Sequence, residues 1–290
     1  MFLKYRGEII LFFVSIIAAS GWFFSKFAMA EFPPIGFMGA RFSLGFFIFL
    51  PFAYSQLKQL PREQIIKACL VGLCYTTYLS LWTLGLIHSE HFGEGAFLVS
   101  LSMLIAPLIS WLFFKDKPQK VFWLSLPIAV LGLALLAFGR GQLHFSLGSI
   151  IFLSSSTTAA IYFVLNNHFA RNVPVLSLTT LQVGIVGLLC SIYSYCFESY
   201  PEAFSSEIWW WFLASLLITT NGRMLLQTIG QKYCNVGTAA LIMVLEPVWT
   251  FVFSIIILHE PLTWIKGLGC LCILLALFVY RLPSFLKKSA

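Results

Sequence analysis

The 290-residue chain is 59% hydrophobic and only 10% charged, with a mean hydropathy of +0.90, whereas soluble domains carry about 25% charged residues. This composition excludes an ordinary soluble protein and indicates a membrane protein. The net charge of +7 comes from basic residues spread over separate short segments. They form no patch or stripe of the kind that binds nucleic acid, so no nucleic-acid partner is expected.

Apolar runs of about 20 residues recur along the whole chain, and each is long enough to cross about 30 Å of hydrocarbon. The first run stays apolar through Phe27 and similar runs follow it, which favours a transmembrane helix over a signal peptide. Short connections leave no room for a soluble domain. We predict an all-α membrane protein with ten transmembrane helices in the bilayer, at residues 8–30, 34–57, 65–87, 93–114, 119–139, 147–169, 174–197, 207–230, 236–258 and 263–282.

Basic residues lie mostly in one set of alternating connections and at the two ends of the chain, while the opposite connections are mostly acidic. Lysine and arginine are retained on the cytoplasmic side during insertion. We therefore expect an integral protein of a bacterial cytoplasmic (inner) membrane, with both termini cytoplasmic. The basic residues on that side are Lys4, Arg6, Lys58, Arg62, Lys67, Lys115, Lys117, Lys120, Arg171, Lys232, Arg281, Lys287 and Lys288.

The two halves of the sequence resemble each other. LSMLIAPLISWLF at 101–113 recurs as LIMVLEPVWTFVF at 241–253, with Pro107 matching Pro247 and Ala106 replaced by Glu246. We predict repeats at 1–142 and 143–290, each with five spans, and an odd number of crossings makes the second repeat inverted. Inverted repeats are typical of secondary transporters, which bind substrate near the midplane between the repeats. Further matches are KFAMAEFPP from Lys26 with NHFARNVP from Asn167, and TLG at Thr83 with TIG at Thr228.

Motifs in both halves carry a family resemblance. PPIGFMGARF at 33–42, TLG…GAFLVSLSMLIAP…KDKP in the first half and TIGQKYCNVGTAALIMVLEP…LHEPLTW in the second resemble the EamA-like branch of the drug/metabolite transporter superfamily. The resemblance covers nearly the whole chain. It implies a five-plus-five helix arrangement and the export or exchange of a small organic solute, often an amino acid or a related metabolite. It does not name the substrate.

Charged residues inside the spans are the leading site candidates, because a charge at the bilayer centre costs about 2.5–3.5 kcal/mol. Glu246 lies near the middle of its span. Arg223 lies about four or five residues to the cytoplasmic side of the middle of its span, Arg41 lies about four residues to the outer side, and Lys26 is closer still to the outer surface. These signs suit a zwitterion whose amine lies near Glu246 and whose carboxylate lies near Arg41 or Arg223. Glu246 is also a candidate for proton uptake, or for a structural ion pair with Arg223. Pro247 removes a backbone hydrogen bond and is expected to bend the helix beside it.

Aromatic and amide side chains complete the predicted site. Tyr78 and Tyr162 lie in mid-membrane with hydroxyls to satisfy, and Trp82 and Trp249 offer surfaces for stacking or for cation–π contact with an ammonium group. Asn166 lies at the cytoplasmic end of its span, where a gate or an interfacial cap is expected. The predicted substrate-binding residues are therefore Glu246, Arg223, Arg41, Tyr78, Tyr162, Trp82, Trp249, Lys26 and Asn166.

Transport of a small molecule by alternating access is the favoured function, by an exporter or exchanger of an amino-acid-like zwitterion, acting as a monomer or homodimer with protons as candidate coupling ions. Efflux of a lipophilic cation is the alternative substrate class, and a membrane-embedded enzyme is the alternative of another class. No cofactor or metal is expected, because His88, Glu90, His91 and Glu94 resemble a metal site only loosely and a solvated loop explains them.

Overall fold

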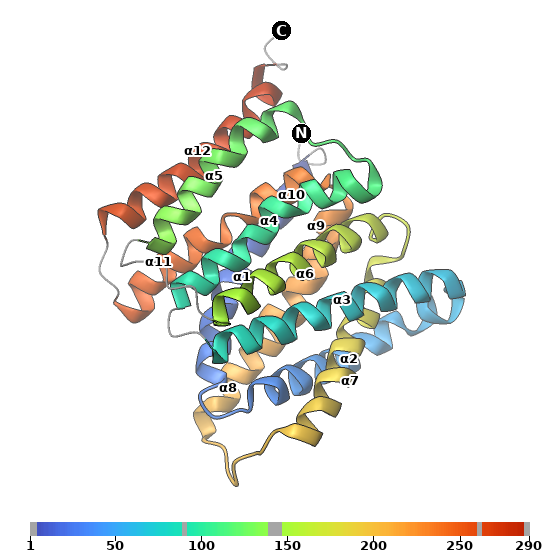
Figure 1. Cartoon of the computed structure of the whole chain (residues 1–290). Helices are drawn as coiled ribbons and strands as arrows, with labels where there is room; N and C mark the ends of the chain where they lie inside the picture. Colours follow the sequence, from blue (N-terminus) through green and yellow to red (C-terminus); the bar gives the residue numbers. More distant parts are fainter. Residues whose placement is uncertain (1–4, 89–91, 139–146, 260–262, 287–290) are drawn as a thin grey trace.

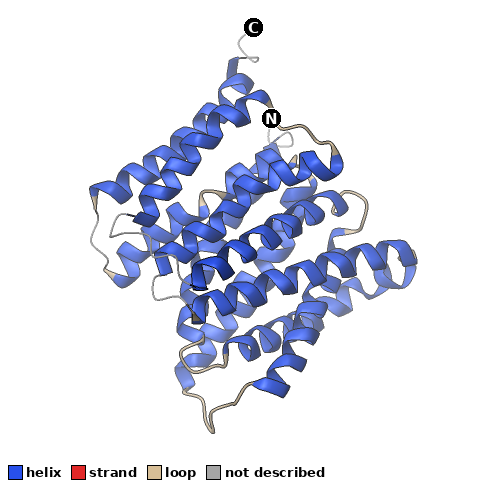
Figure 2. Cartoon of the chain, in the orientation of Figure 1, coloured by secondary structure: helices blue, strands red, loops and turns tan. Residues whose placement is uncertain are grey.

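The computed structural model describes residues 5–88, 92–138, 147–259 and 263–286, and these contain helices and no strand (Figure 2). The fold is all-α, as predicted. Helical structure occurs in every stretch that the hydropathy pattern assigned to a span. In chain order the elements are α1 (Arg6–Ala28), α2 (Pro34–Gln59), α3 (Arg62–Ile87), α4 (Phe92–Phe114), α5 (Lys120–Phe138), α6 (Leu147–Phe169), α7 (Val175–Phe197), α8 (Ser206–Ala214), the π-helical segment η2 (Ser215–Gly222), α9 (Arg223–Lys232), α10 (Val236–Met243), α11 (Glu246–Leu258) and α12 (Trp264–Leu286).

Six helical segments of the described chain are long and apolar enough to cross a membrane. Five of them are α1, α2, α3, α6 and α7, and the sixth is the stretch Val236–Leu258, which joins α10 and α11. Shorter apolar helices occur at Leu98–Phe114, Lys120–Leu136 and Trp264–Tyr280. The count of ten crossings therefore stays a prediction.

Two of the predicted spans are interrupted. The eighth is divided into α8, η2 and α9, because its middle turns are wide π-helical turns. The ninth is split at Val244 and Leu245 into α10 and α11. The break lies just before Pro247, which has no N–H to donate to the carbonyl four residues earlier. In the first half, α4 continues through Pro107, so a proline at this position does not by itself break the helix.

Helix packing follows the same plan in both halves of the chain. α2 packs against α7 and α5 against α12, so two helix pairs join equivalent parts of the halves (Figure 1). α6 contacts α3 and α4, while α1 contacts both the α8–η2–α9 unit and the α10–α11 unit. If α1 corresponds to α6, α3 to α8–η2–α9 and α4 to α10–α11, each of these contacts has a counterpart in the other half. A pseudo-twofold arrangement of the halves requires this.

Small residues bring the paired helices close together. A Cβ added at Gly187 of α7 would lie 2.5 Å from the backbone nitrogen of Ser43 in α2, and one added at Gly39 of α2 would lie 2.7 Å from the backbone nitrogen of Ser191 in α7. Close backbone approach at small residues is the usual way in which membrane helices associate. These contacts fix how α2 and α7 are rotated against each other.

Side-chain hydrogen bonds also connect both ends of the α2–α7 pair. Glu198, just after α7, accepts hydrogen bonds from the backbone N–H groups of Ile35 (2.9 Å) and Gly36 (2.6 Å) in the first turn of α2. At the other end, the Ser177 hydroxyl in the first turn of α7 donates to Gln56 Oε1 of α2 at 3.2 Å. Helix N-termini carry unpaired N–H groups that favour a carboxylate partner. The first connection is a charged cap of the α2 N-terminus, and the second is a neutral hydrogen bond between two side chains.

The outer surface of the bundle is apolar, as a surface in contact with lipid must be. Large hydrophobic side chains that lie exposed on its helices include Phe47, Phe52, Leu112, Phe197, Trp210 and Trp264. Polar side chains such as Asn166, Gln182 and Gln231 are instead fully buried between helices. The chain is therefore arranged as an integral membrane protein, with its polar groups inside.

Candidate functional site

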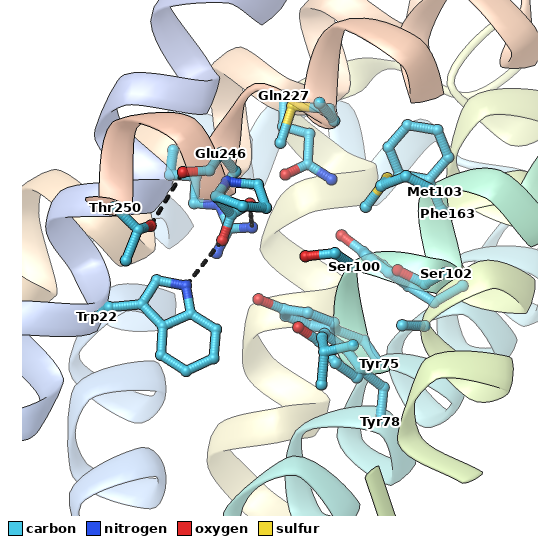
Figure 3. A pocket seen from close by; sticks show the side chains of 16 residues that line it. Trp22, Tyr75, Tyr78, Ser100, Ser102, Met103, Phe163, Gln227, Glu246 and Thr250 are labelled. Carbon is cyan, nitrogen blue, oxygen red and sulfur yellow. Dashed lines mark hydrogen bonds and ion pairs between the residues drawn. The ribbon is translucent and has the colours of Figure 1, made fainter. Parts of the chain in front are cut away.

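A cavity in the interior of the bundle lies between α1, α3, α4, α6, α9 and the α10–α11 break (Figure 3). Its lining combines one acid and one base with hydroxyl, amide and aromatic groups. It contains Trp22, Tyr75, Tyr78, Val99, Ser100, Ser102, Met103, Ala159, Tyr162, Phe163, Arg223, Gln227, Met243, Glu246, Pro247 and Thr250.

Glu246 occupies the first turn of α11, directly after the break in the ninth predicted span. Pro247 follows it and also lines the cavity, so the break and the carboxylate lie at the same place. The Thr250 hydroxyl donates a hydrogen bond to the backbone carbonyl of Glu246 at 2.9 Å, one turn farther along α11. This hydrogen bond helps to fix the backbone of Glu246 at the start of α11.

Both carboxylate oxygens of Glu246 have a partner. The indole Nε1–H of Trp22 in α1 donates to Oε1 at 3.0 Å, and an Nη2 nitrogen of Arg223 lies 3.6 Å from Oε2. The Glu246 and Arg223 side chains are 18% and 23% exposed, so neither is fully enclosed by protein. The ion pair joins α9 to α11, and Trp22 joins this pair to the first half of the chain (Figure 3).

Arg223 is the first residue of α9 and follows the π-helical segment η2 directly. Its Nε is buried without a hydrogen-bond partner, which leaves the guanidinium with capacity for another acceptor. Gln227 lies one turn farther along the same face of α9 and also lines the cavity. π-helical turns often occur at functional sites, because they change which residues a helix presents.

Aromatic rings form the wall of the cavity opposite Trp22 and Glu246 (Figure 3). Tyr75 stacks on Tyr162 with ring centroids 4.3 Å apart, and Tyr78 lies 5.9 Å from Tyr75. The three tyrosines come from α3 and α6, so the wall joins helices of both halves. Stacked rings of this kind form a stiff apolar surface with polar tips.

Glu246, Arg223, Tyr78 and Tyr162 were predicted from the sequence as binding residues, and all of them line the cavity. Glu246 and Arg223 form the ion pair that the sequence offered as one alternative. Because both side chains also face the cavity, the ion pair and a binding role are compatible.

Trp82, Trp249 and Lys26 were also predicted, but the structure places them away from the lining. Trp82 lies behind Trp22, with an edge-to-face contact at 5.1 Å between ring centroids. Trp249 packs edge-to-face on Phe12 of α1 at 5.8 Å. Lys26 is exposed in the last turn of α1.

Asn166 lies in a buried amide network rather than in the cavity wall. Its Oδ1 accepts from Gln182 Nε2 at 2.7 Å, and its Nδ2 donates to Gln231 Oε1 and, at 3.3 Å, to Thr228 Oγ1. The Tyr162 hydroxyl donates to Gln182 Oε1 at 3.5 Å, which connects this network to the wall. The network ties α6, α7 and α9 together and holds Tyr162 in place.

Arg41, also predicted, is buried between α1, α2 and η2 and does not line the cavity. Its guanidinium donates hydrogen bonds to Ser25 and Ser215, whereas the sequence analysis expected it to contact the substrate. The sequence could not give the direction in which this side chain points, because that depends on how α2 is rotated against its neighbours.

Sequence analysis did not select several residues that line the cavity. Trp22, like the predicted tryptophans, lies within a span and could stack on a substrate, but it was left out of the predicted set, although an indole N–H in mid-membrane needs an acceptor. Gln227 could have been found from its spacing of one turn from Arg223. Ser100 and Ser102 carried no signal, because serine is common in membrane helices as a helix-packing residue.

Positions that correspond in the two halves meet at the cavity. The sequence alignment pairs Met103 with Met243 and Tyr78 with Arg223, and the offset that pairs Lys26 with Asn167 also pairs Trp22 with Phe163. Both members of each of the three pairs Met103–Met243, Tyr78–Arg223 and Trp22–Phe163 line the cavity. A site on a pseudo-twofold axis is expected to be lined in this way.

Among the described residues, no group of three or more His, Cys, Asp or Glu side chains is placed to hold a metal ion. Of the outer-loop residues considered in the sequence, Glu90 and His91 lie outside the described part of the chain.

An internal cavity with one acid and one base, inside an apolar helical bundle, suits a membrane transporter. The model of the EamA-like transporter family matches residues 5–138 and 146–282. The chain belongs to the EamA-like transporter family. Because this is a family of transporters, the enzyme alternative gains no support.

Curated relatives carry the same description. An uncharacterized transporter of Archaeoglobus fulgidus is 26% identical over 93% of this chain and 83% of its own length. The uncharacterized transporter YvbV of Bacillus subtilis is 26% identical over 99% of this chain and 95% of its own. A solved structure, described only as the crystal structure of a protein, matches 96% of this chain and 98% of its own with a TM-score of 0.77 and 16% identity, which shows the fold alone.

Proposed function

We propose that this chain is a secondary transporter that exports or exchanges a small organic zwitterion, in the first place an amino acid or an amino-acid-like metabolite, by alternating access. The observation that carries the proposal is that Glu246 and Arg223, of opposite charge, line the same cavity with part of each side chain exposed. A zwitterion presents the complementary pair of charges on one small molecule.

The geometry suits exchange of the ion pair for substrate. At 3.6 Å the Arg223–Glu246 contact is longer than the 2.7–2.9 Å of a strong charge-assisted hydrogen bond. A substrate amine near Glu246 and a substrate carboxylate near Arg223 replace one long contact by two shorter ones. The tyrosine wall then packs against the rest of the substrate.

The proposed architecture is ten transmembrane helices in two inverted repeats, 1–142 and 143–290. The two ranges matched by the family model, 5–138 and 146–282, support this division. The exchange of helix neighbours between the halves and the paired residues in the cavity support a pseudo-twofold axis through the site. In such folds the substrate site lies where the repeats meet.

Membrane placement and coupling complete the proposal. The distribution of lysine and arginine supports a bacterial cytoplasmic (inner) membrane with both termini cytoplasmic. Glu246 is the proposed site of proton coupling, because protonation weakens its hold on both Arg223 and a substrate amine. The transporter acts as a monomer or homodimer within the lipid bilayer.

A lipophilic cation is a second candidate substrate, and a specific observation favours it. Trp22 donates to Glu246, and Tyr75, Tyr78 and Tyr162 line the facing wall, so one carboxylate is surrounded by aromatic rings. Aromatic faces attract organic ammonium groups. In this case Arg223 would act only as the counterion that an entering cation displaces.

Counterflow into proteoliposomes distinguishes the two candidates. Vesicles loaded with an amino-acid mixture are tested for uptake of labelled zwitterions, with competitors that lack either the amine or the carboxylate. We expect saturable counterflow of a zwitterion that neither truncated competitor inhibits strongly, because each lacks one anchoring charge. Strong inhibition by organic cations, with no zwitterion taken up, would reject the zwitterion in favour of the cation. A thermal-shift screen of metabolites on the purified protein supplies the first substrates to test.

A further inference from the structure

Arg41 and Arg223 both lie within the helical bundle, and their surroundings differ. Arg223 has the Glu246 carboxylate beside it. Arg41 is only 7% exposed, and its contacts within the described part of the chain include no carboxylate. A buried charge without a counter-charge is strongly disfavoured in a protein interior and in a membrane. Arg41 therefore requires an explanation that the proposed substrate site does not provide.

All the partners of the Arg41 guanidinium are neutral. One Nη1 nitrogen donates to Ser215 Oγ at 2.7 Å and to Ser25 Oγ at 3.2 Å, and Nη2 contacts Met38 Sδ at 3.0 Å. The rings of Phe37 and Phe42 lie 4.8 and 5.1 Å from the guanidinium carbon. The Nε–H is buried and has no acceptor. The side chain is fixed in position, but its charge is not neutralised.

The same contact between α2 and η2 holds a further polar side chain without hydrogen-bond partners. Asn221 is 6% exposed, and both its amide nitrogen and its amide oxygen are buried without a hydrogen bond. It lies against Gly45, where an added Cβ would be 2.5 Å from Asn221 Oδ1. Gly45 is one turn after Arg41 on the same face of α2. The Ser25 hydroxyl accepts from the guanidinium and keeps its own O–H to donate, whereas the Ser215 hydroxyl also lies 3.5 Å from Thr219 Oγ1.

Buried N–H and O–H donors around a positive charge, without an acid, are the chemistry of an anion site. We infer that Arg41, with Ser25, Ser215 and Asn221, forms a second binding site for a small monovalent anion at the α1–α2–η2 contact, separate from the substrate cavity. The occupant is small because Arg41 is almost fully enclosed. Chloride and the carboxylate of a small organic acid share this chemistry.

An occupied site has a consequence for η2. Ser215 begins this π-helical segment, and Arg223 follows its end directly. An anion that holds Arg41 and Ser215 together fixes the start of the segment that presents Arg223 to the cavity. The anion is in this way a structural ligand of the substrate site without entering it.

Thermal unfolding of the purified full-length protein tests the inference. Gluconate, which is too large for the site, is replaced at constant ionic strength by chloride in one series and by acetate in another. A ligand that binds only the folded state raises the unfolding temperature saturably, by about 2–5 °C at ten times its dissociation constant. A rise with chloride assigns the site to an inorganic anion, and a rise with acetate alone assigns it to a carboxylate. No rise with either anion in the wild-type protein overturns the inference.

Variants separate the two arginines. Arg41→Gln is expected to abolish the shift, and Ser25→Ala to raise the anion dissociation constant roughly fivefold, the cost of one hydrogen bond. Arg223→Gln and Glu246→Gln are matched controls that should keep the shift. A shift that survives Arg41→Gln, or one that disappears only with Arg223→Gln, overturns the assignment. The substrate site is tested by transport in Glu246→Gln, whereas the anion site is tested by the unfolding temperature in Arg41→Gln. A failure of the proposed function therefore leaves the test of the anion site unaffected.

Discussion

Replacing Glu246 by glutamine removes a charge from the cavity while keeping the shape of the side chain and an acceptor for Trp22. It leaves Arg223 without a counter-charge. At 3.6 Å and an effective dielectric constant of about 20, the lost attraction is about 4–5 kcal/mol. Breaking a fully buried pair costs about 3–5 kcal/mol. Since these side chains are 18% and 23% exposed, we expect a loss of about 2–3 kcal/mol in the free energy of unfolding.

The double variant separates a structural role from a binding role. Arg223→Gln is expected to be destabilising by a similar amount, whereas Glu246→Gln with Arg223→Gln places two amides side by side and should recover about 2 kcal/mol of the summed loss. Transport should not recover with it, because a zwitterion needs both charges. Thermal unfolding in detergent and counterflow in proteoliposomes are measured on the same four proteins.

Two results would refute this reasoning in different ways. Losses that add to within about 0.5 kcal/mol would mean that the two side chains do not interact appreciably. A double variant that transports at the wild-type rate would mean that the ion pair only joins α9 to α11 and that the substrate is held elsewhere. In that second case the proposed zwitterion site would have to be abandoned.

Three further predictions concern other parts of the chain. Trp22→Phe keeps the aromatic volume but removes a hydrogen bond to a carboxylate, so the unfolding free energy should fall by about 1.5–3 kcal/mol and the substrate KM should rise; an unchanged KM would show that the indole N–H does not orient the site. The Cβ of Gly187→Ala would meet the backbone of α2, so this variant should lose about 1–3 kcal/mol in the free energy of unfolding. A Cβ at Gly267 in α12 has nothing within 4 Å, so Gly267→Ala should be neutral or slightly stabilising. Equal effects of the two variants would contradict the close contact between α2 and α7. The side chain and the backbone N–H of Ser205 hydrogen-bond to Glu31 and lower the pKa of its carboxyl below 4.5. The stabilisation from this contact should be fully present above about pH 4.5 and be lost as the pH falls through the lowered pKa. Glu31→Gln should reduce the pH dependence of the unfolding temperature in that acid range, and an unchanged dependence would assign it to other groups.

Several features followed from the sequence because they depend on local composition or on the cost of burying charge. The membrane class follows from long apolar runs, which require no knowledge of how the helices pack. The prediction of two repeats rests on aligned prolines and small residues. Glu246 and Arg223 could be assigned to an internal site because a charge within a span is costly wherever its helix lies.

Helix breaks were only partly accessible. Pro247 predicted a disturbance beside Glu246, and the structure has a break there. Pro107 occupies the matching position of α4, yet that helix continues. The π-helical turns of η2 had no signal in the sequence, because no proline or unusual residue marks them.

The tertiary structure alone decided which polar residues share the cavity. Arg41 and Arg223 look alike in the sequence, but one contacts serine hydroxyls at η2 and the other contacts Glu246. The difference lies in how each helix is rotated about its axis, since successive side chains point about 100° apart. In a soluble protein the apolar stripe of a helix reveals that rotation. Here the faces toward lipid and toward protein are both apolar, so only close contacts such as that of Gly187 with α2 determine it.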